Sequence, residues 1–109
     1  MRRGEVWTAA GGMDYAGKPR PVVIVQDDRF NATSSITICA LTGDPTDAPL
    51  FRLAIAPSET NGRRTTSRLM VDKLTTIPKA KLGTCIGRLA DDEMVRLNRA
   101  MMIFLGLAA

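Results

Sequence analysis

The hydrophobic residues before residue 90 fall into short runs that are separated by turn-forming residues. The runs are rich in Val, Ile, Leu and Thr and are bounded by Gly, Pro, Asn and Asp, a pattern typical of β-strands joined by turns. This pattern predicts five strands, at residues 4–9, 21–26, 36–41, 50–57 and 67–74. The run at 21–26 is apolar almost without interruption, which predicts burial on both of its faces. Two further segments have less regular patterns. One helical turn is predicted within residues 27–34, and a helical turn followed by a short strand is predicted within residues 77–89.

The pattern changes to a helical period near the C-terminus. Four apolar residues lie three or four positions apart and form a stripe on one side of a helix: Met94, Leu97, Met101 and Leu105. Three acidic residues at 91–93 would occupy the first turn, where the helix dipole favours negative charge. Gly106 is a suitable residue to end the helix. The sequence therefore predicts an amphipathic helix over residues 91–105, whose stripe packs on the core.

Short strands followed by one late helix predict a mainly β (α+β) fold, a small and mostly antiparallel β-barrel capped by a C-terminal helix. A chain of 109 residues supports one hydrophobic core, so residues 1–109 are expected to form a single domain. Residues 10–19 contain three glycines and a proline and form a connection of about ten residues, longer than the usual ~4–6. Long connections of this kind are often functional, which makes this loop a candidate part of a binding site.

The composition excludes some kinds of chemistry but does not identify the function. The net charge of +4 permits a polyanionic partner but is equally compatible with a slightly basic solvated surface. The chain has no histidine, so neither an imidazole acid or base nor a histidine-containing metal site is available. Cys39 and Cys85 lie in apolar runs and are predicted to be small buried hydrophobes. No run is long enough to span a bilayer or resembles a signal peptide, so a cytoplasmic protein is expected.

Several segments together resemble one protein family. In order they read RRGEVW, KPRPVVIVQDDRFN, ITICALTGD and SRLMVDKLTTIPKAKLGTCIGRL, followed by the amphipathic helix. Over residues 3–107 this set closely resembles the MazF/PemK toxins of bacterial toxin–antitoxin systems. The resemblance implies an SH3-like barrel with a C-terminal helix, assembled as a homodimer. It also implies a metal-independent, cofactor-free endoribonuclease that cuts single-stranded RNA at specific sequences and arrests growth. The implied partner is an antitoxin whose flexible acidic segment covers the RNA groove.

Arg20 is the first candidate catalytic residue. It stands between Pro19 and Pro21 at the start of an apolar strand, and both prolines restrict the backbone around it. A guanidinium offers a planar fork of donors to phosphate oxygens, and such a group stabilises developing charge best when it is already in place. From the residues alone, Arg20 is either a pre-placed phosphate ligand or a solvated residue beside a turn. The family resemblance places a catalytic arginine at this position.

Further candidate residues follow from the same comparison of residue type and place. Thr42 ends the third predicted strand, where its hydroxyl either donates to a phosphate or caps its own turn. The resemblance favours a catalytic threonine here, and Gly43 would let a nucleotide approach the backbone. Tyr15 and Lys18 lie in the long loop, where they could stack on a base or hold a phosphate. Arg68, at the start of the fifth strand, is a further candidate for RNA binding.

Asp72 completes the candidate RNA site but leaves the proton chemistry open. In some members of the family the aspartate at this position has been considered as a base. An aspartate that hydrogen-bonds and locks the barrel is an equal alternative. Met70 stands where some relatives have an arginine, and their loop histidine is missing. The general acid and base are therefore unassigned. Two other functions stay open on this fold: a toxin that poisons gyrase through its C-terminal helix, and an RNA-binding module without catalysis.

Overall fold

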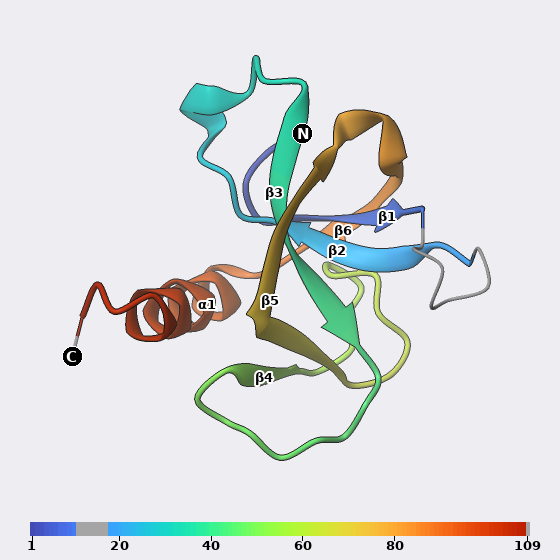
Figure 1. Ribbon diagram of the computed structural model, residues 1–109. Coiled ribbons are helices and arrows are strands. Elements are labelled where there is room, and N and C mark those ends of the chain that lie inside the picture. Colours follow the sequence, from blue (N-terminus) through green and yellow to red (C-terminus); the bar gives the residue numbers. More distant parts are fainter. Residues whose placement is uncertain (11–17, 109) are drawn as a thin grey trace.

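The computed structural model describes residues 1–10 and 18–108 and contains one sheet, one α-helix and two short 3-10 helices (Figure 1). The strands are β1 (Glu5–Ala9), β2 (Arg20–Ile24), β3 (Ser35–Thr42), β4 (Arg52–Ile55), β5 (Ser67–Pro78) and β6 (Leu82–Arg88). The helices are α1 (Asp91–Phe104), η2 (Asp28–Phe30) and η3 (Lys79–Lys81). Each predicted strand and helical turn is confirmed within a few residues, and β5 continues four residues beyond its predicted end.

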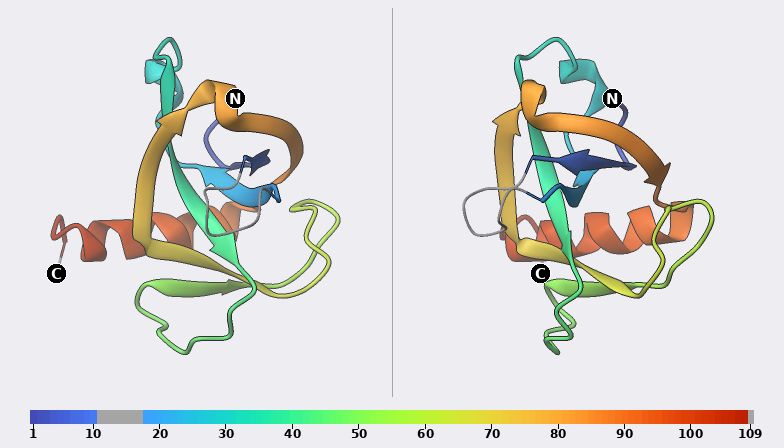
Figure 2. Two further views of the ribbon diagram at one scale, coloured as in Figure 1. Left: turned by 45° about the vertical axis from the view of Figure 1, so that its right-hand side comes forward. Right: turned by 90° about the vertical axis from the view of Figure 1, so that its right-hand side faces the viewer.

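The six strands form one antiparallel sheet in the order β4-β5-β3-β2-β1-β6. The sheet is strongly curved, and β6 sweeps back toward the segment that follows β4 (Figure 2). Within the described residues β4 and β6 are not paired with each other, so the predicted barrel is not closed by hydrogen bonds all the way round. The mainly β architecture with a C-terminal helix is confirmed.

The segment between β4 and β5 bridges the two edges of the sheet. The backbone N–H of Arg88 donates to the carbonyl oxygen of Thr60 at 2.8 Å, which joins β6 to this segment. Asn61 is fully buried there, and its side-chain oxygen accepts bonds from the N–H groups of Ser58 and Arg63. Gly62 has a φ of +67°, which suits a residue without a side chain. The turn predicted from its Asn-Gly pair thus becomes the seam of the barrel.

The central strands are buried on both faces, as the unbroken apolar run predicted. Val22 and Ile24 of β2 belong to one hydrophobic cluster, whereas Val23 between them belongs to another. Because successive side chains of a strand point to opposite faces, the two clusters lie on opposite sides of β2. The larger cluster includes Leu97 and Ala100 of α1, so the helix covers one of these faces.

Two predictions of burial are wrong. Leu105 caps α1 and is 56% exposed, because the helix has passed the edge of the sheet by that point. Cys85 is exposed because β6 is an edge strand with most of its residues open to solvent, whereas Cys39 is buried as predicted. No helix among the described residues is long and apolar enough to cross a lipid bilayer.

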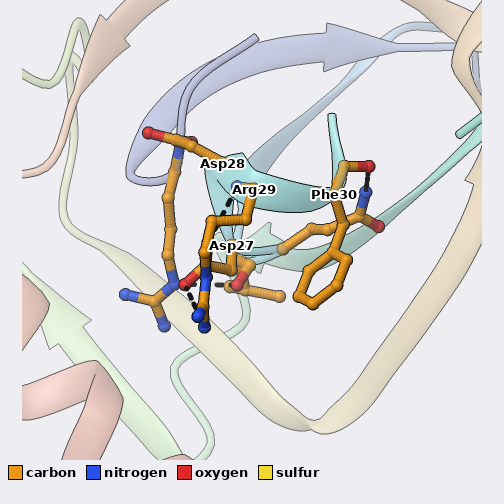
Figure 3. A network of polar contacts seen from close by, with 7 residues as sticks. Asp27, Asp28, Arg29 and Phe30 are labelled. Carbon is orange, nitrogen blue, oxygen red and sulfur yellow. Dashed lines mark hydrogen bonds and ion pairs between the residues drawn. The ribbon is translucent and has the colours of Figure 1, made fainter. Parts of the chain in front are cut away.

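A polar cluster fixes the chain just after β2 (Figure 3). Asp27 caps η2 by accepting a bond from the N–H of Arg29 at 2.8 Å, and Arg29 also lies over the ring of Phe30. Asp28 accepts a bond from the N–H of Arg3 at 2.7 Å, which connects this turn to the start of the chain. One end of β2 is therefore tied down by η2, and Arg20 lies at the other end.

Candidate active site

Arg20, Thr42 and Arg68 lie in one row across three neighbouring strands. In the sheet Thr42 of β3 is opposite Arg68 of β5, and Val22 of β2 is opposite Ala40 of β3. Beyond that pair, β2 begins two residues earlier at Arg20 and β3 ends two residues later at Thr42, so both residues lie at the same end of the two strands. Because side chains alternate along a strand, Arg20 shares a face with Val22, and Thr42 shares a face with Ala40. Directly opposite residues of an antiparallel sheet project from the same face. Paired strands lie about 4.8 Å apart, so β2 and β5 flank β3 at about 10 Å from each other. We call these three residues the cross-strand row.

The sequence around Arg20 explains why it can be held at this place. Arg20 is the first residue of β2 and pairs with Ala9 of β1. The residues that follow it, from Val22 to Ile24, are at most 3% exposed and anchor the strand on both faces. The half-buried Arg20 therefore extends from a rigid strand rather than from a flexible loop. A phosphate brought to this edge would meet a donor whose backbone is already ordered.

The position of Thr42 is compatible with both roles that the sequence left open, capping its own turn and donating to a phosphate. Its hydroxyl oxygen accepts a hydrogen bond from the backbone N–H of Asp44 at 3.1 Å, so the residue does cap its own turn. The carboxylate of Asp44 in turn accepts bonds from the backbone and hydroxyl of Thr46. Because a hydroxyl can accept and donate at once, the capped oxygen still has a proton to donate to a ligand. Gly43 is exposed, and a Cβ built on it meets no atom within 4 Å.

The loop candidates are less well placed by the structure. Lys18 is exposed and precedes Arg20 by two residues, at the same end of β2. Tyr15 lies outside the described residues. Among the described residues, no group of three or more His, Cys, Asp or Glu side chains is arranged to hold a metal ion.

Asp72 is engaged by a residue that the sequence did not single out. Arg52 donates from Nε to one carboxylate oxygen at 2.7 Å and from a terminal nitrogen to the other at 2.9 Å. Both side chains are largely shielded, with 12% of Arg52 and 22% of Asp72 exposed. The hydrogen bonds from Arg52 lower the pKa of Asp72, and the pKa of Arg52 is raised in return. This geometry agrees with the alternative in which Asp72 hydrogen-bonds within the protein and links two strands of the sheet.

Acid is expected to destabilise the fold partly through Asp72. Because Arg52 bonds to the ionised carboxylate, the pKa of Asp72 in the folded state lies below the reference value of 3.8. The stabilisation is thus complete above that value and is lost as the pH falls through the folded-state pKa. Asp72→Asn should lower the free energy of unfolding near pH 7 much more than near pH 2. Urea denaturation at the two pH values measures this difference, and an equal loss at both would contradict it.

Comparison with known proteins identifies the family of the chain and agrees with its fold. A family model described as "PemK-like, MazF-like toxin of type II toxin-antitoxin system" matches residues 2–105. The chain is 53% identical over 108 residues to the probable endoribonuclease MazF of Mycolicibacterium smegmatis, and the match covers 99% of both chains. It is 29% identical to endoribonuclease MazF9 of Mycobacterium tuberculosis, with 98% of both chains covered.

A solved structure agrees with these sequence matches. It is described as an endoribonuclease in complex with its cognate antitoxin from mycobacterial species. The TM-score is 0.82 at 25% identity, and the match covers 100% of this chain and 98% of the other. The strand order and the C-terminal helix described above are therefore those of a known architecture.

Proposed function

Since the chain belongs to the PemK-like, MazF-like toxin family of type II toxin–antitoxin systems, we propose that it is an endoribonuclease toxin that cuts single-stranded RNA in the cytoplasm and arrests growth. The observation that carries this proposal is the cross-strand row. Arg20 and Arg68 supply two permanent positive charges on one face, and the Thr42 hydroxyl lies between them. Such a row matches the phosphodiester backbone of a single strand.

The row suggests a reaction in which the RNA supplies its own nucleophile. The 2′-oxygen loses its proton and forms a bond to the adjacent phosphorus, while the bond from phosphorus to the 5′-oxygen breaks. The 5′-oxygen takes up a proton, so that the products carry a 2′,3′-cyclic phosphate and a 5′-hydroxyl. Extra negative charge develops on the phosphorane oxygens, and the Arg20 guanidinium is the proposed group that stabilises it. Thr42 is proposed to donate a hydrogen bond to the same phosphate.

The remaining candidates are proposed to bind RNA around this centre. Lys18 and Arg68 would hold the flanking phosphates, and Gly43 leaves room for a nucleotide because nothing in the protein fills the space beside it. Tyr15 is proposed to stack on a base from the adjoining loop. Sequence specificity would then come from contacts to the edges of unpaired bases.

Two protein partners complete the proposal. One is a cognate antitoxin, which the solved relative has in its complex. The other is a second copy of this chain, since α1 carries a group of exposed apolar residues larger than a solvated helix needs. These residues are Val95, Met102, Ile103 and Phe104, with Leu105 and Leu107 beyond the helix end. The homodimer would cover part of this surface.

Cleavage of a long single-stranded RNA in the presence of EDTA tests the proposal. The purified protein should cut the RNA at a small number of recurring sites, and the new ends should be a cyclic phosphate and a 5′-hydroxyl. Ligation that requires a 5′-hydroxyl end, followed by sequencing, maps the sites and checks the chemistry together. Intact RNA at equimolar protein would overturn the nuclease proposal, and RNA that is bound but uncut would indicate a binding module instead.

A further inference from the structure

The Arg52–Asp72 ion pair lies where β5 departs from the regular sheet. Between the pairs Cys39–Leu74 and Leu41–Leu69, β3 advances by two residues while β5 advances by five. Residues 70–73 of β5 therefore have no partner on β3, and the strand turns through a sharp corner next to β4 (Figure 1). A bulge of this size removes ladder hydrogen bonds from the strand that bends.

The corner is held from the β4 side instead. The N–H of Val71 donates to the carbonyl oxygen of Phe51 at 2.9 Å, and the next residue on each strand forms the Arg52–Asp72 pair. Arg52 is opposite Met70 in the β4–β5 ladder, so the ion pair crosses diagonally to a residue two positions farther on. Two parallel hydrogen bonds fix both the distance and the orientation of a carboxylate and a guanidinium. The pair thus links the corner of β5 to β4 beside the Val71–Phe51 hydrogen bond.

Arg68 depends on this corner. It lies two residues before the unpaired stretch, and the register that places it opposite Thr42 starts again only at Leu69. In the β4–β5 ladder Arg52 is opposite Met70 and Ala54 is opposite Arg68, so the two arginines are diagonal neighbours on adjacent strands. Hydrogen bonds from Thr46 lower the pKa of the nearby Asp44, and the charges of both arginines lower it further. Arg52 donates hydrogen bonds to the Asp72 carboxylate, whereas among the described residues no such bond to an acid is seen for Arg68.

We propose that Asp72 and Arg52 are a positioning pair: the pair fixes the corner of β5 so that Arg68 stays in the cross-strand row, and it holds Arg52 away from the RNA. On this view Asp72 acts through Arg52 and not as the general base, because both of its oxygens accept hydrogen bonds from a guanidinium. The cleavage part of this inference rests on the proposed function, whereas the structural part does not.

Four variants test the cleavage part. Asp72→Asn and Arg52→Gln are each expected to weaken kcat/KM for RNA about tenfold, mainly through a higher KM, and to leave the shape of the pH profile unchanged. The exchanged variant Arg52→Glu with Asp72→Arg should recover a large part of the loss, because an opposite-charge pair is restored. Asp47→Asn removes an exposed carboxylate from the neighbouring loop and should have no effect. A loss in kcat of many hundredfold for Asp72→Asn alone, without recovery in the exchanged variant, would overturn the proposal in favour of a base.

Amide hydrogen exchange tests the structural part and needs no RNA. Backbone amides of residues 68–73 should exchange at least tenfold faster in Asp72→Asn and Arg52→Gln than in the wild type. Amides of β2 and α1, and all amides of Asp47→Asn, should keep their wild-type rates. Unchanged exchange at residues 68–73 would overturn the positioning role whether or not the protein cuts RNA. If the two variants show the expected faster exchange but the wild-type protein leaves RNA intact, the proposed function is refuted and the positioning role is not.

Discussion

Arg20→Ala is expected to lower the rate of RNA cleavage by about a thousandfold while the protein remains folded. The side chain is half-buried at the end of β2, and the core residues of that strand begin two positions later, so its loss leaves the apolar packing intact. A preorganised donor that meets charge in the transition state contributes a factor of about 10²–10³. Hydrogen bonds from a charged donor to a phosphate are stronger than those from a neutral donor, so the loss for Arg20→Ala is expected at the upper end of this range. Single-turnover cleavage of a short RNA that contains one mapped site measures the effect.

Matched variants separate the fork of the guanidinium from its charge. Arg20→Lys retains the charge without the planar donors and should lie between wild type and Arg20→Ala. Arg88→Ala removes an exposed arginine at the far end of β6 and should leave cleavage unchanged. Thr42→Val removes the hydroxyl that caps Asp44 and should reduce cleavage less than Arg20→Ala does. Defined cuts at wild-type rate in Arg20→Ala would remove Arg20 from the mechanism.

Local sequence pattern was sufficient to predict the secondary-structure elements and much of their burial. The uninterrupted apolar run of β2 predicted burial on both faces, and the two clusters that share its alternate residues confirm it. The prolines around Arg20 predicted a restricted backbone at the start of a strand, and β2 begins at Arg20. In both cases the cause is local, since strand alternation and the proline ring act within a few residues.

Features that depend on pairing between distant segments were not predicted. β5 runs on to Pro78 because Thr75 to Pro78 pair with the beginning of β3, which residues 67–74 by themselves do not reveal. Arg52 looked like one more residue of a short strand, because its partner is fixed by the bulge in β5. Arg20 and Arg68 are 48 positions apart, and only the registers of three strands bring them into one row. The candidate residues could be named from the sequence, whereas their arrangement needed the fold.

Gly62→Ala is expected to be the most destabilising of the alanine substitutions at the glycines that the structure describes, by about 2–5 kcal/mol. A φ of +67° costs a residue with a side chain roughly 1–2 kcal/mol. A Cβ at this position would also lie 2.1 Å from the carbonyl oxygen of Ile86, a backbone atom of β6 that cannot turn aside. Overpacking of this kind adds about 1–3 kcal/mol. Against a typical stability of about 5–15 kcal/mol, the seam between β6 and the segment before β5 would open readily.

Three other glycines separate the two causes, because each has a different combination of them. Gly87→Ala keeps an ordinary φ but places a Cβ 2.5 Å from the carbonyl oxygen of Thr60, so it should lose only the packing part. Gly106→Ala has a φ of +75° in open space and should lose about 1 kcal/mol. Gly43→Ala has neither problem and should melt like the wild type. Urea denaturation ranks the four variants. If Gly62→Ala lowers the free energy of unfolding no more than Gly106→Ala does, the backbone around Ile86 can move aside without destabilising the fold. The contact between β6 and the segment before β5 would then not be what maintains the curvature of the sheet.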